Sequence, residues 1–299
     1  MHYLSLSEDL KRRFGSKVYK LSLQSGCSCP NRDGRLSYGG CSFCSEGGSG
    51  DFAAPLLPIR QQLEIAKKRV EAKLPKSEKE SQHRYIAYFQ SYTNTYGPEE
   101  TLGALFREAM APPEIVALSV GTRPDCISPR MLEILTELNQ EKPVYVELGL
   151  QTVHEETAAR INRGYALPVF EDCYRRLKAA GLMVVVHVIL GLPGEDEEKM
   201  LTTVSYLSAL TPTLDGIKLQ LLHVLQGTRL AAEYMEKPFP ILTLKEYSQL
   251  VVKCLKLLPA ETVVHRITGD GPKRLLLAPL WSADKKRVLN TLQKAIAEA

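Results

Sequence analysis

The chain has 299 residues, of which 44% are hydrophobic and 24% charged, with a net charge of +4 at pH 7. This length and composition can bury a full core, which predicts one large domain or one domain with a small extension. No segment approaches the roughly 18 apolar residues of a membrane span, and the charged start does not resemble an export signal. We therefore expect a cytoplasmic protein without a membrane segment, whose charge permits an RNA partner without requiring one.

Short β-branched runs alternate with longer segments of helical period, which is typical of βα units around a parallel sheet. Six strands are predicted, at residues 17–23, 85–90, 115–120, 144–150, 183–190 and 217–224. Five helices are expected between them, at residues 59–72, 98–110, 129–139, 168–180 and 195–210. Six βα units are fewer than the eight of a closed barrel. The predicted fold class is therefore α/β, a partial (βα)6 TIM-like barrel.

The last part of the chain is predicted to form a small extension on this barrel. Its elements are a helix at residues 244–257, an extended run at 262–268 and an amphipathic helix at 283–297. We accordingly divide the chain into a core over residues 1–230, with a cysteine-rich loop at 24–48, and an extension over 231–299. The charge-rich segment 71–84 is interpreted as a helix end followed by a solvated loop.

Four of the seven cysteines, Cys27, Cys29, Cys41 and Cys44, lie in the loop after the first predicted strand. Thiols stay reduced in the cytosol, so clustered cysteines indicate metal ligands rather than disulfides. One hypothesis is a structural zinc ion bound by all four thiolates. The other is a [4Fe-4S] cluster bound by three, with one iron left open. Spacing does not choose between them, but the end of a barrel strand is where active sites lie.

Seven motifs occur in a fixed order along the chain: CPNRDGRLSYGGCSFC, FQSYTNTY, GTRPD, VELGLQT, GLPGE, LHVLQGT and HRITGDGP. In these motifs the chain resembles the radical S-adenosylmethionine (SAM) superfamily, and within it the bacterial YhcC/YtqA-like family, related to the catalytic subunit of Elongator. The resemblance runs nearly end to end. It implies that Cys29, Cys41 and Cys44 bind the cluster, with eleven residues between the first two. Cys27 then lies outside the ligand set.

The resemblance implies reductive cleavage of SAM at the cluster to release a 5′-deoxyadenosyl radical, with an electron donor such as flavodoxin or ferredoxin. Six residues are predicted to bind SAM: Glu147, Gln151, Arg163, Gly191, Gly194 and Glu195. Arg163 matches the arginine that related enzymes use on the SAM carboxylate. The glycines would let the backbone approach the adenine. Each has a structural alternative, as a polar loop pair, a solvated helix-end arginine or an ordinary strand-to-helix turn.

Further candidates lie at or beyond the ends of predicted strands, where the loops of a βα barrel meet. The predicted pocket residues are Gln90, Tyr92, Asn94, Tyr96, Arg123, His187 and His223. The alternative for the tyrosines is packing against the rim, and a lone strand histidine is more often a hydrogen-bonded core residue. Asp125 is expected to face the cavity beside Arg123. Arg266 and Asp270 are interpreted as substrate or structural contacts from the extension.

The resemblance implies tRNA as the substrate, with a reaction on the 5-substituent of the wobble uridine that leads from carboxymethylaminomethyl towards aminomethyl. The basic segments DLKRRFGSK and DKKRVLNTLQK, with Arg32 and Arg35, could contact phosphates, although a charge run is usually a solvated face. No RNA-binding module such as an RRM or KH domain is recognisable. Two other hypotheses stay open: a radical SAM enzyme acting on a small molecule or protein, and a zinc-stabilised binding protein.

Overall fold

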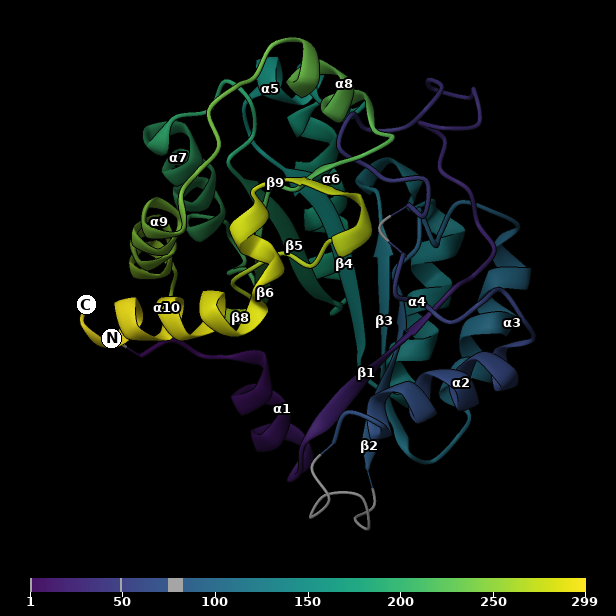
Figure 1. The fold of residues 1–299 in the computed structure, drawn as a ribbon. Coiled ribbons are helices and arrows are strands. Elements are labelled where there is room, and N and C mark those ends of the chain that lie inside the picture. The colour runs from purple at the N-terminus through teal and green to yellow at the C-terminus, as the bar shows by residue number, and fades with distance from the viewer. Residues whose placement is uncertain (1, 49, 75–82) are drawn as a thin grey trace.

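The structure is a computed structural model that describes residues 2–48, 50–74 and 83–299. Seven parallel strands form its main sheet in the order β1-β2-β3-β4-β5-β6-β8. Their bounds are β1 (Val18–Leu23), β2 (Arg84–Phe89), β3 (Ile115–Thr122), β4 (Val144–Gln151), β5 (Met183–Leu190), β6 (Gly216–Leu221) and β8 (Val263–Arg266). The sheet curls into a half-barrel with helices on its outer side (Figure 1). The predicted α/β partial barrel is confirmed.

Helices cover the outer face of this sheet. They are α2 (Ile59–Glu71), α3 (Glu99–Met110), α4 (Pro129–Glu141), α6 (Leu167–Ala179), α7 (Glu197–Ser208) and α9 (Leu244–Leu257), and each agrees with its prediction to within two residues at either end. Local capping explains this agreement. Ser128 accepts a hydrogen bond from Met131 N at the start of α4, and Thr243 forms a capping box with Glu246 at the start of α9.

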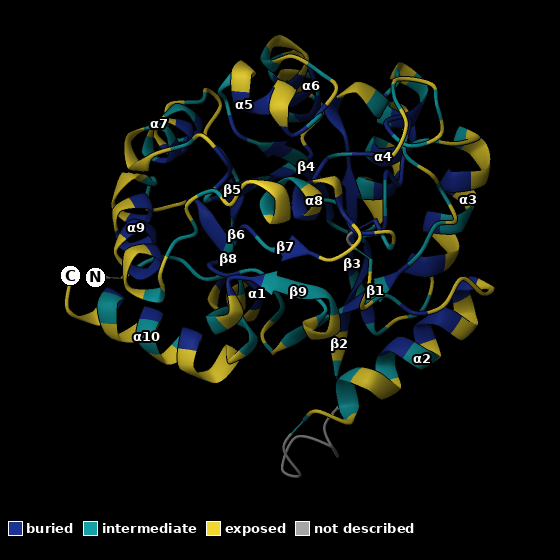
Figure 2. Cartoon of the chain, turned by 45° about the horizontal axis from the view of Figure 1, so that its top comes forward, coloured by how far each residue is buried: buried dark blue, intermediate teal, exposed yellow. Residues whose placement is uncertain are grey.

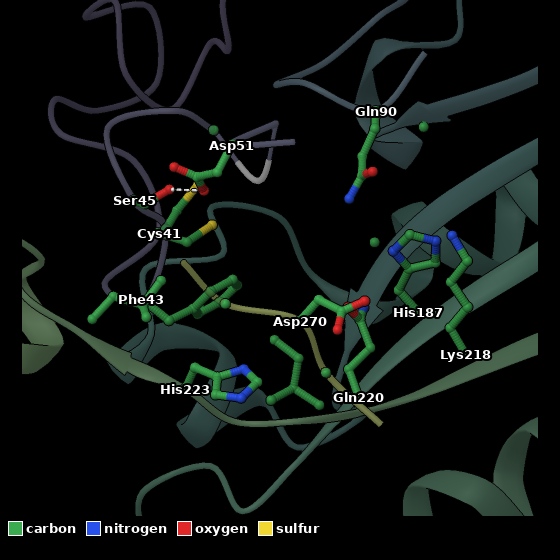
Figure 3. A pocket seen from close by; sticks show the side chains of 18 of the residues that line it. Cys41, Phe43, Ser45, Asp51, Gln90, His187, Lys218, Gln220, His223 and Asp270 are labelled. Atoms are coloured by element: carbon green, nitrogen blue, oxygen red, sulfur yellow. Dashed lines mark hydrogen bonds between the residues drawn. The ribbon is translucent and has the colours of Figure 1, made fainter. Parts of the chain in front are cut away.

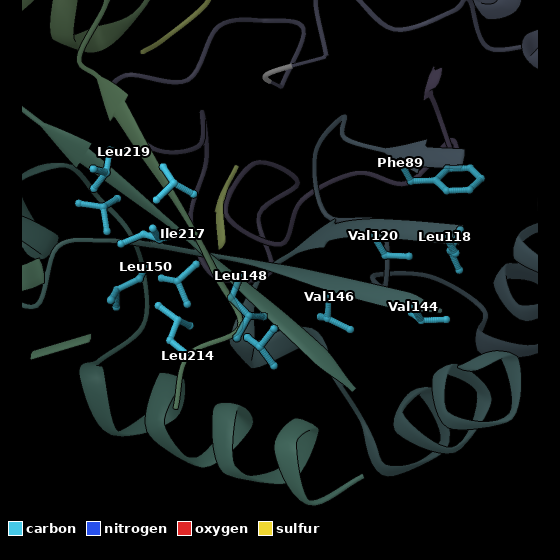
Figure 4. Packing of buried hydrophobic residues seen from close by; sticks show 14 of the residues in the cluster. Phe89, Leu118, Val120, Val144, Val146, Leu148, Leu150, Leu214, Ile217 and Leu219 are labelled. Carbon is cyan, nitrogen blue, oxygen red and sulfur yellow. The ribbon is translucent and has the colours of Figure 1, made fainter. Parts of the chain in front are cut away.

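The main core lies between the sheet and these helices (Figure 4). Strand residues such as Phe89 and Val146 are fully buried there, and the Phe89 ring packs edge-on against Phe106 of α3 at 5.0 Å. The helices expose their other faces to solvent, as the colouring by burial shows (Figure 2). These strands are covered by helices on one face and enclose the inside of the half-barrel with the other. Strands in such a position have nearly continuous apolar sequences, so all six predicted strands could be recognised.

The extended run predicted at residues 262–268 is observed as a strand of the main sheet. It forms β8, which pairs in parallel with β6, so that Lys218 lies opposite Arg266. Helix α9 is the crossover that such a parallel pair requires. The sixth predicted strand also ends early, because Val224–Leu225 (β7) pairs in antiparallel fashion with Leu276–Ala278 (β9). The segment after residue 230 therefore adds the edge strand β8 to the half-barrel.

Three helices were not predicted: α1 (Leu6–Phe14), α5 (Glu155–Arg160) and α8 (Arg229–Glu236). All are short, and short helices take most of their stability from tertiary packing. The last helix, α10 (Lys285–Ala297), is confirmed. The segment predicted as a loop over 71–84 lies mostly outside the described residues. No helix in the described part of the chain is long and apolar enough to cross a membrane.

Helix α1 closes the half-barrel at the end where the strands begin. Just before it, Ser5 forms a parallel bridge with Val264 of the edge strand β8, and α1 contacts β1 at the other edge. Leu10 of α1 is buried in a cluster of inward-facing side chains from the central strands, which comprises Ile86, Ala117, Tyr145 and Val185. The open end of the half-barrel is therefore the end where the strands finish.

Candidate functional site

A cavity of about 760 Å³ occupies the inside of the half-barrel towards this open end. Its walls come from the cysteine-rich loop, the strands of the main sheet and the segment 269–285. It brings together these predicted residues: Cys29, Cys41, Cys44, Gln90, Tyr92, Arg123, Glu147, Gln151, Arg163, His187, His223, Arg266 and Asp270. Figure 3 shows Cys41 and Ser45 on one side of the cavity, and His187 beside Lys218 on the other.

The strands contribute side chains to the cavity in two layers. The deep layer consists of Lys20, Tyr88, Ser119, Glu147, His187 and Lys218, one from each of β1 to β6; all of them line the cavity except the buried Ser119, which bonds Glu147. The upper layer consists of Ser22, Gln90, Gly121, Gly149, Ile189 and Gln220, each two residues further along the chain, with Gln90 just beyond the end of β2. Residues i and i+2 of a strand face the same side, so the two layers stack. Two glycines in the upper layer leave room for a ligand below the cysteine-rich loop.

Glu147 is the centre of the deep layer. Its Oε1 accepts hydrogen bonds from Lys20 Nζ (2.8 Å) and Ser119 Oγ (2.6 Å). Its Oε2 accepts from His187 Nε2 (2.8 Å) and from Lys218 Nζ. Burial acts to raise the pKa of this fully buried carboxyl, but Lys20 and Lys218 outweigh burial and hold the pKa well below its ordinary value. Glu147 is therefore ionised, and its acceptor positions are filled by the protein.

Burial lowers the pKa of the two basic side chains next to this carboxylate, His187 and Lys218. It lowers the pKa of His187 to about 4, helped by the charge of Lys218, so the ring is neutral at pH 7 and must carry its proton on Nε2 to donate to Glu147. Burial also lowers the pKa of Lys218 to about 7, against the opposing effect of Glu147. Lys218 Nζ donates to Tyr88 Oη at 2.9 Å. The ammonium groups of Lys20 and Lys218 each lie 4.6 Å from the centroid of the Tyr88 ring.

Lys20, Ser119 and Lys218 were not predicted from the sequence. A usable signal was present for the two lysines, because each interrupts an apolar strand, where a charge is costly to bury without a partner. The same reasoning applies to Glu147, which also interrupts an apolar strand. Applied to all three strands, it would have predicted a buried ionic cluster.

Two of the predicted SAM-binding residues line the cavity but are engaged by the protein. Arg163 is 1% exposed, and its guanidinium donates to the carbonyl oxygens of Leu150, Thr152 and Tyr165. These contacts fix the connection between β4 and α6. Glu147 has the four protein donors described above. Their contacts with SAM stay predictions.

Gln151, with a φ of 66°, also lines the cavity. Within the described residues, the lining does not include Gly191, Gly194 or Glu195. Glu195 instead accepts a hydrogen bond from Thr152 Oγ1 at 2.5 Å. The predicted approach of this turn to the adenine stays a prediction.

Of the remaining predicted pocket residues, some line the cavity and others lie outside its lining. Asn94 is fully buried, and its side chain bonds the carbonyl oxygens of Phe89 (3.1 Å) and Gly121 (2.8 Å), so it ties strand ends together outside the cavity lining. Tyr96 likewise does not line the cavity as the structure describes it. His223 lines it, is paired with Ser282 Oγ at 3.0 Å, and has its pKa lowered to about 4 by burial.

Arg123 reaches from the cavity wall to two partners. It forms a two-pronged ion pair with Asp125 and donates to the carbonyl oxygen of Arg163 at 2.7 Å. Arg123 and Asp125 are therefore neighbours, as expected, although Asp125 itself is not part of the cavity lining that the described residues form. Arg266 and Asp270 both line the cavity and form an ion pair of 3.3 Å.

The cysteine-rich loop is held against the segment around Arg163. Asn31 Nδ2 donates to the carbonyl oxygen of Asn162 at 2.5 Å, and Ser42 N donates to that of Ile161 at 2.8 Å. Arg32, predicted as a phosphate contact, instead donates to the carbonyl oxygens of Cys44 (3.0 Å) and Ser45. The loop is thus fixed at both of its cysteine-bearing turns.

Three thiols of this loop suit an iron–sulfur cluster. Cys29, Cys41 and Cys44 line one cavity wall and form no disulfide, and burial raises the pKa of Cys41 to about 12, with Cys44 adding to the rise. A cationic centre would offset this cost and stabilise the thiolates. Among the described residues, no three His, Cys, Asp or Glu side chains are arranged to hold a single metal ion. A cluster binds each thiolate through a different iron.

Cys27 lies next to Gly97 and does not share the cavity wall of these three thiols as the structure describes it. It is absent from the cavity lining as described, and its Sγ lies 3.5 Å from where a Cβ on Gly97 would be. A four-cysteine zinc site would need Cys27 to join the other three, so the arrangement favours the three-thiolate hypothesis.

Comparison with known proteins agrees with this geometry. The family model of the Radical SAM superfamily matches residues 29–207, and that of the Radical_SAM C-terminal domain matches residues 214–298. The chain therefore belongs to the radical SAM superfamily. Enzymes of this superfamily use a [4Fe-4S] cluster and SAM, so this chain is a radical SAM enzyme with those cofactors.

Individual proteins of this superfamily are similar to the chain over most of its length. It is 41% identical to YtqA of Bacillus subtilis (strain 168), over 98% of this chain and 89% of that protein. It is 37% identical to YhcC of Escherichia coli (strain K12), over 93% of this chain and 86% of that protein. A weaker similarity, 26%, links 65% of this chain to 35% of Elongator complex protein 3 of Schizosaccharomyces pombe. The structure of the archaeal Methanocaldococcus infernus Elp3 shares the fold, with a TM-score of 0.64, 16% identity, and coverage of 90% of this chain and 63% of that one.

Proposed function

We propose that this radical SAM enzyme acts on tRNA and modifies the 5-substituent of the wobble uridine, from carboxymethylaminomethyl towards aminomethyl. The similarity to Elongator complex protein 3 supports a substrate of this kind. The observation that carries the proposal is a basic surface at the mouth of the cavity, which suits the phosphates of a nucleic acid.

We call this surface the basic rim, and it consists of Lys273, Arg274, Lys285, Lys286 and Arg287. All five side chains are exposed, and they lie on the 3₁₀ turn Lys273–Leu275 and the start of α10. Lys273 and Lys285 also line the cavity, so the rim is continuous with it. A second, shallow hollow runs on from these two residues to Lys286 and Arg287. A strand of RNA whose reacting base entered the cavity would meet these charges first.

The other predicted basic segment lies elsewhere. It belongs to α1 at the opposite end of the half-barrel, where Arg12 and Arg13 form ion pairs with the buried Asp9. The basic segment on α1 therefore does not lie at the mouth of the cavity, and it is not part of the proposed phosphate-binding surface. The segment at the start of α10 is the one that the fold brings to it.

Within the cavity, we propose that Cys29, Cys41 and Cys44 hold the cluster. When bound, the cluster supplies the electron that cleaves SAM, and a flavodoxin or ferredoxin would reduce it. The upper layer offers Ser22, Gln90 and Gln220 as uncharged hydrogen-bonding groups, next to the space that Gly121 and Gly149 leave. This suits the positioning of a ribose and a uracil, both of which present several donors and acceptors.

The test uses anaerobically purified enzyme with its cluster, SAM, dithionite and an anticodon stem-loop RNA that carries carboxymethylaminomethyluridine. We expect 5′-deoxyadenosine together with loss of the modified nucleoside, and neither product with Cys41→Ala. Formation of 5′-deoxyadenosine with an unchanged RNA, in both the stem-loop and full-length tRNA, would contradict the proposal. That result would favour a small-molecule or protein substrate.

A further inference from the structure

The deep layer of the cavity holds more positive charge than its own carboxylate balances. Lys20 and Lys218 share Glu147, while His187 is neutral. The neighbouring Arg266 shares the carboxylate of Asp270 with Lys285, at 3.3 Å and 2.8 Å, so Asp270 has no charge to spare for either lysine. No second carboxylate in the described part of the chain lies within ion-pair distance of either lysine. With both lysines protonated, one positive charge is therefore uncompensated at the bottom of a cavity that is closed below by α1.

Lys20 is the better placed of the two lysines to meet a ligand. Its side chain is 20% exposed, against 7% for Lys218. Its ammonium carries three N–H donors, and one of them is used on Glu147. Lys218 has two partners, Tyr88 and Glu147, and its side chain is the more buried of the two lysines. Lys20 thus keeps donors available, while Lys218 contributes charge from a buried position.

We infer that the deep layer is a subsite for a carboxylate group of the substrate, with Lys20 as the residue that contacts it and Lys218 as a supporting charge. A carboxylate would remove the charge imbalance and accept the remaining Lys20 donors, and charge-assisted hydrogen bonds of this kind are strong when shielded from water. The inference rests on the proposed function for the identity of the ligand, because a carboxymethylaminomethyl group ends in a carboxylate.

The spacing of the layers agrees with this use of the site. Two residues along a strand correspond to roughly 6.5 Å, so the deep layer lies about that far below the upper layer. A substituent anchored by its carboxylate at Lys20 would extend towards the upper layer and present its methylene groups there. The aminomethyl product lacks the carboxylate, so it would lose this anchor and leave more readily.

The first experiment tests the subsite without RNA. The probe is N-benzylglycine, which reproduces the end of the substituent, and the comparison compound is the neutral N-benzylglycinamide. Each is titrated calorimetrically into the enzyme loaded with cluster and SAM. We expect saturable binding of N-benzylglycine, and at least tenfold weaker binding of the amide. Equal affinity for the two compounds, or no binding of N-benzylglycine, would overturn the inference.

Variants make the test specific to Lys20. We expect Lys20→Met to lose at least tenfold in affinity for N-benzylglycine while its affinity for the amide is unchanged, and Lys20→Arg to restore most of the loss. The matched control is Lys73→Met, because Lys73 also lines the cavity but forms no ion pair with Glu147 in the described structure. Undiminished binding by Lys20→Met, in protein whose cluster absorbance matches wild type, would contradict the assignment.

The second experiment separates this inference from the proposed function. Stem-loop RNAs carrying the free carboxylate or its methyl ester are compared as substrates. If the enzyme converts both equally well and Lys20→Met does not alter their ratio, tRNA modification stands and the subsite is wrong. If neither RNA reacts but N-benzylglycine binds through Lys20, the subsite stands and the substrate is a different carboxylate.

Discussion

Lys20 on β1 and Glu147 on β4 form a 2.8 Å ion pair across the inside of the half-barrel, between residues 127 positions apart. The carboxylate of this pair is fully buried and is shared with Lys218 on β6. The pair therefore joins strands that do not neighbour each other in the sheet. It fixes the width of the cavity at its base as well as its charge.

Replacement of Glu147 by Gln should destabilise the fold. It leaves the two ammonium groups without a counter-charge, and breaking a buried ion pair costs about 3 kcal/mol or more. We expect a loss of about 3 kcal/mol in the free energy of unfolding at pH 6, measured by urea denaturation, because Lys218 can shed its proton and limit the cost. Glu100→Gln is the control, since Glu100 forms an exposed pair with Arg130, and it should give no measurable change. A loss no greater for Glu147→Gln than for the control would contradict this account.

Binding of a carboxylate to the deep layer should weaken as the pH rises through about 7. The groups that face Lys218 are Lys20, Tyr88, Glu147, His187, His265 and Arg266. Of these, Glu147 stays ionised, and burial lowers the pKa of both histidines far enough to keep them neutral. Burial lowers the pKa of Lys218 to about 7, so this ammonium is charged below pH 7 and loses its proton above it.

The measurement is the affinity for N-benzylglycine at a series of pH values from 6 to 8.5. We expect a several-fold decrease across this range, and no such decrease in Lys218→Met, which has no proton to lose. A flat profile for wild type would show that Lys218 does not contribute charge to the subsite.

The three cavity-lining thiols and Cys27 should behave differently. Cys29→Ala, Cys41→Ala or Cys44→Ala should abolish 5′-deoxyadenosine formation under reduction, because each removes a predicted cluster ligand. Cys27→Ala is the matched control and should retain iron, sulfide and SAM cleavage. Stoichiometric zinc in the purified protein, or loss of cleavage in Cys27→Ala alone, would contradict this ligand set.

The basic rim should govern the affinity for tRNA and its dependence on salt. Lys286→Ala with Arg287→Ala should weaken binding to tRNA and lower the slope of log affinity against log salt concentration by up to about 2, as expected if two phosphate contacts are lost. Lys11→Ala with Lys256→Ala removes the same charge from exposed positions on α1 and the end of α9. That control should bind like wild type. Equal losses in the two double variants would indicate a net-charge effect instead of a docking surface.

The sequence predicts the repeating elements well because each helix and strand is specified locally. Apolar periodicity marks the strands, and caps such as Ser128 and Thr243 mark helix starts. The strand β8 was assigned to an extension because its pairing with β6 is a long-range property. A four-residue strand carries too little local pattern to show which sheet it joins.

The candidate site was predictable by residue type but not by partner. Glu147 was predicted as a SAM-binding residue of a strand and Arg163 from its match to the arginine of related enzymes, yet a sequence does not show that Lys218 or the carbonyl oxygen of Leu150 will bond to them. Burial and pairing depend on which strands become neighbours across the barrel. A buried charge needs a partner, so the sequence predicts that Lys20 and Lys218 are paired. It does not predict which residue they pair with.

We propose that this enzyme modifies the wobble uridine of tRNA, and nucleoside mass spectrometry of bulk tRNA tests this proposal most directly. Cells that lack the gene are compared with cells complemented by wild type or by Cys41→Ala. We predict that carboxymethylaminomethyluridine accumulates, and aminomethyl derivatives are lost, both without the gene and with Cys41→Ala, and that wild type alone restores the normal profile. An identical nucleoside profile in all three strains would contradict the claim.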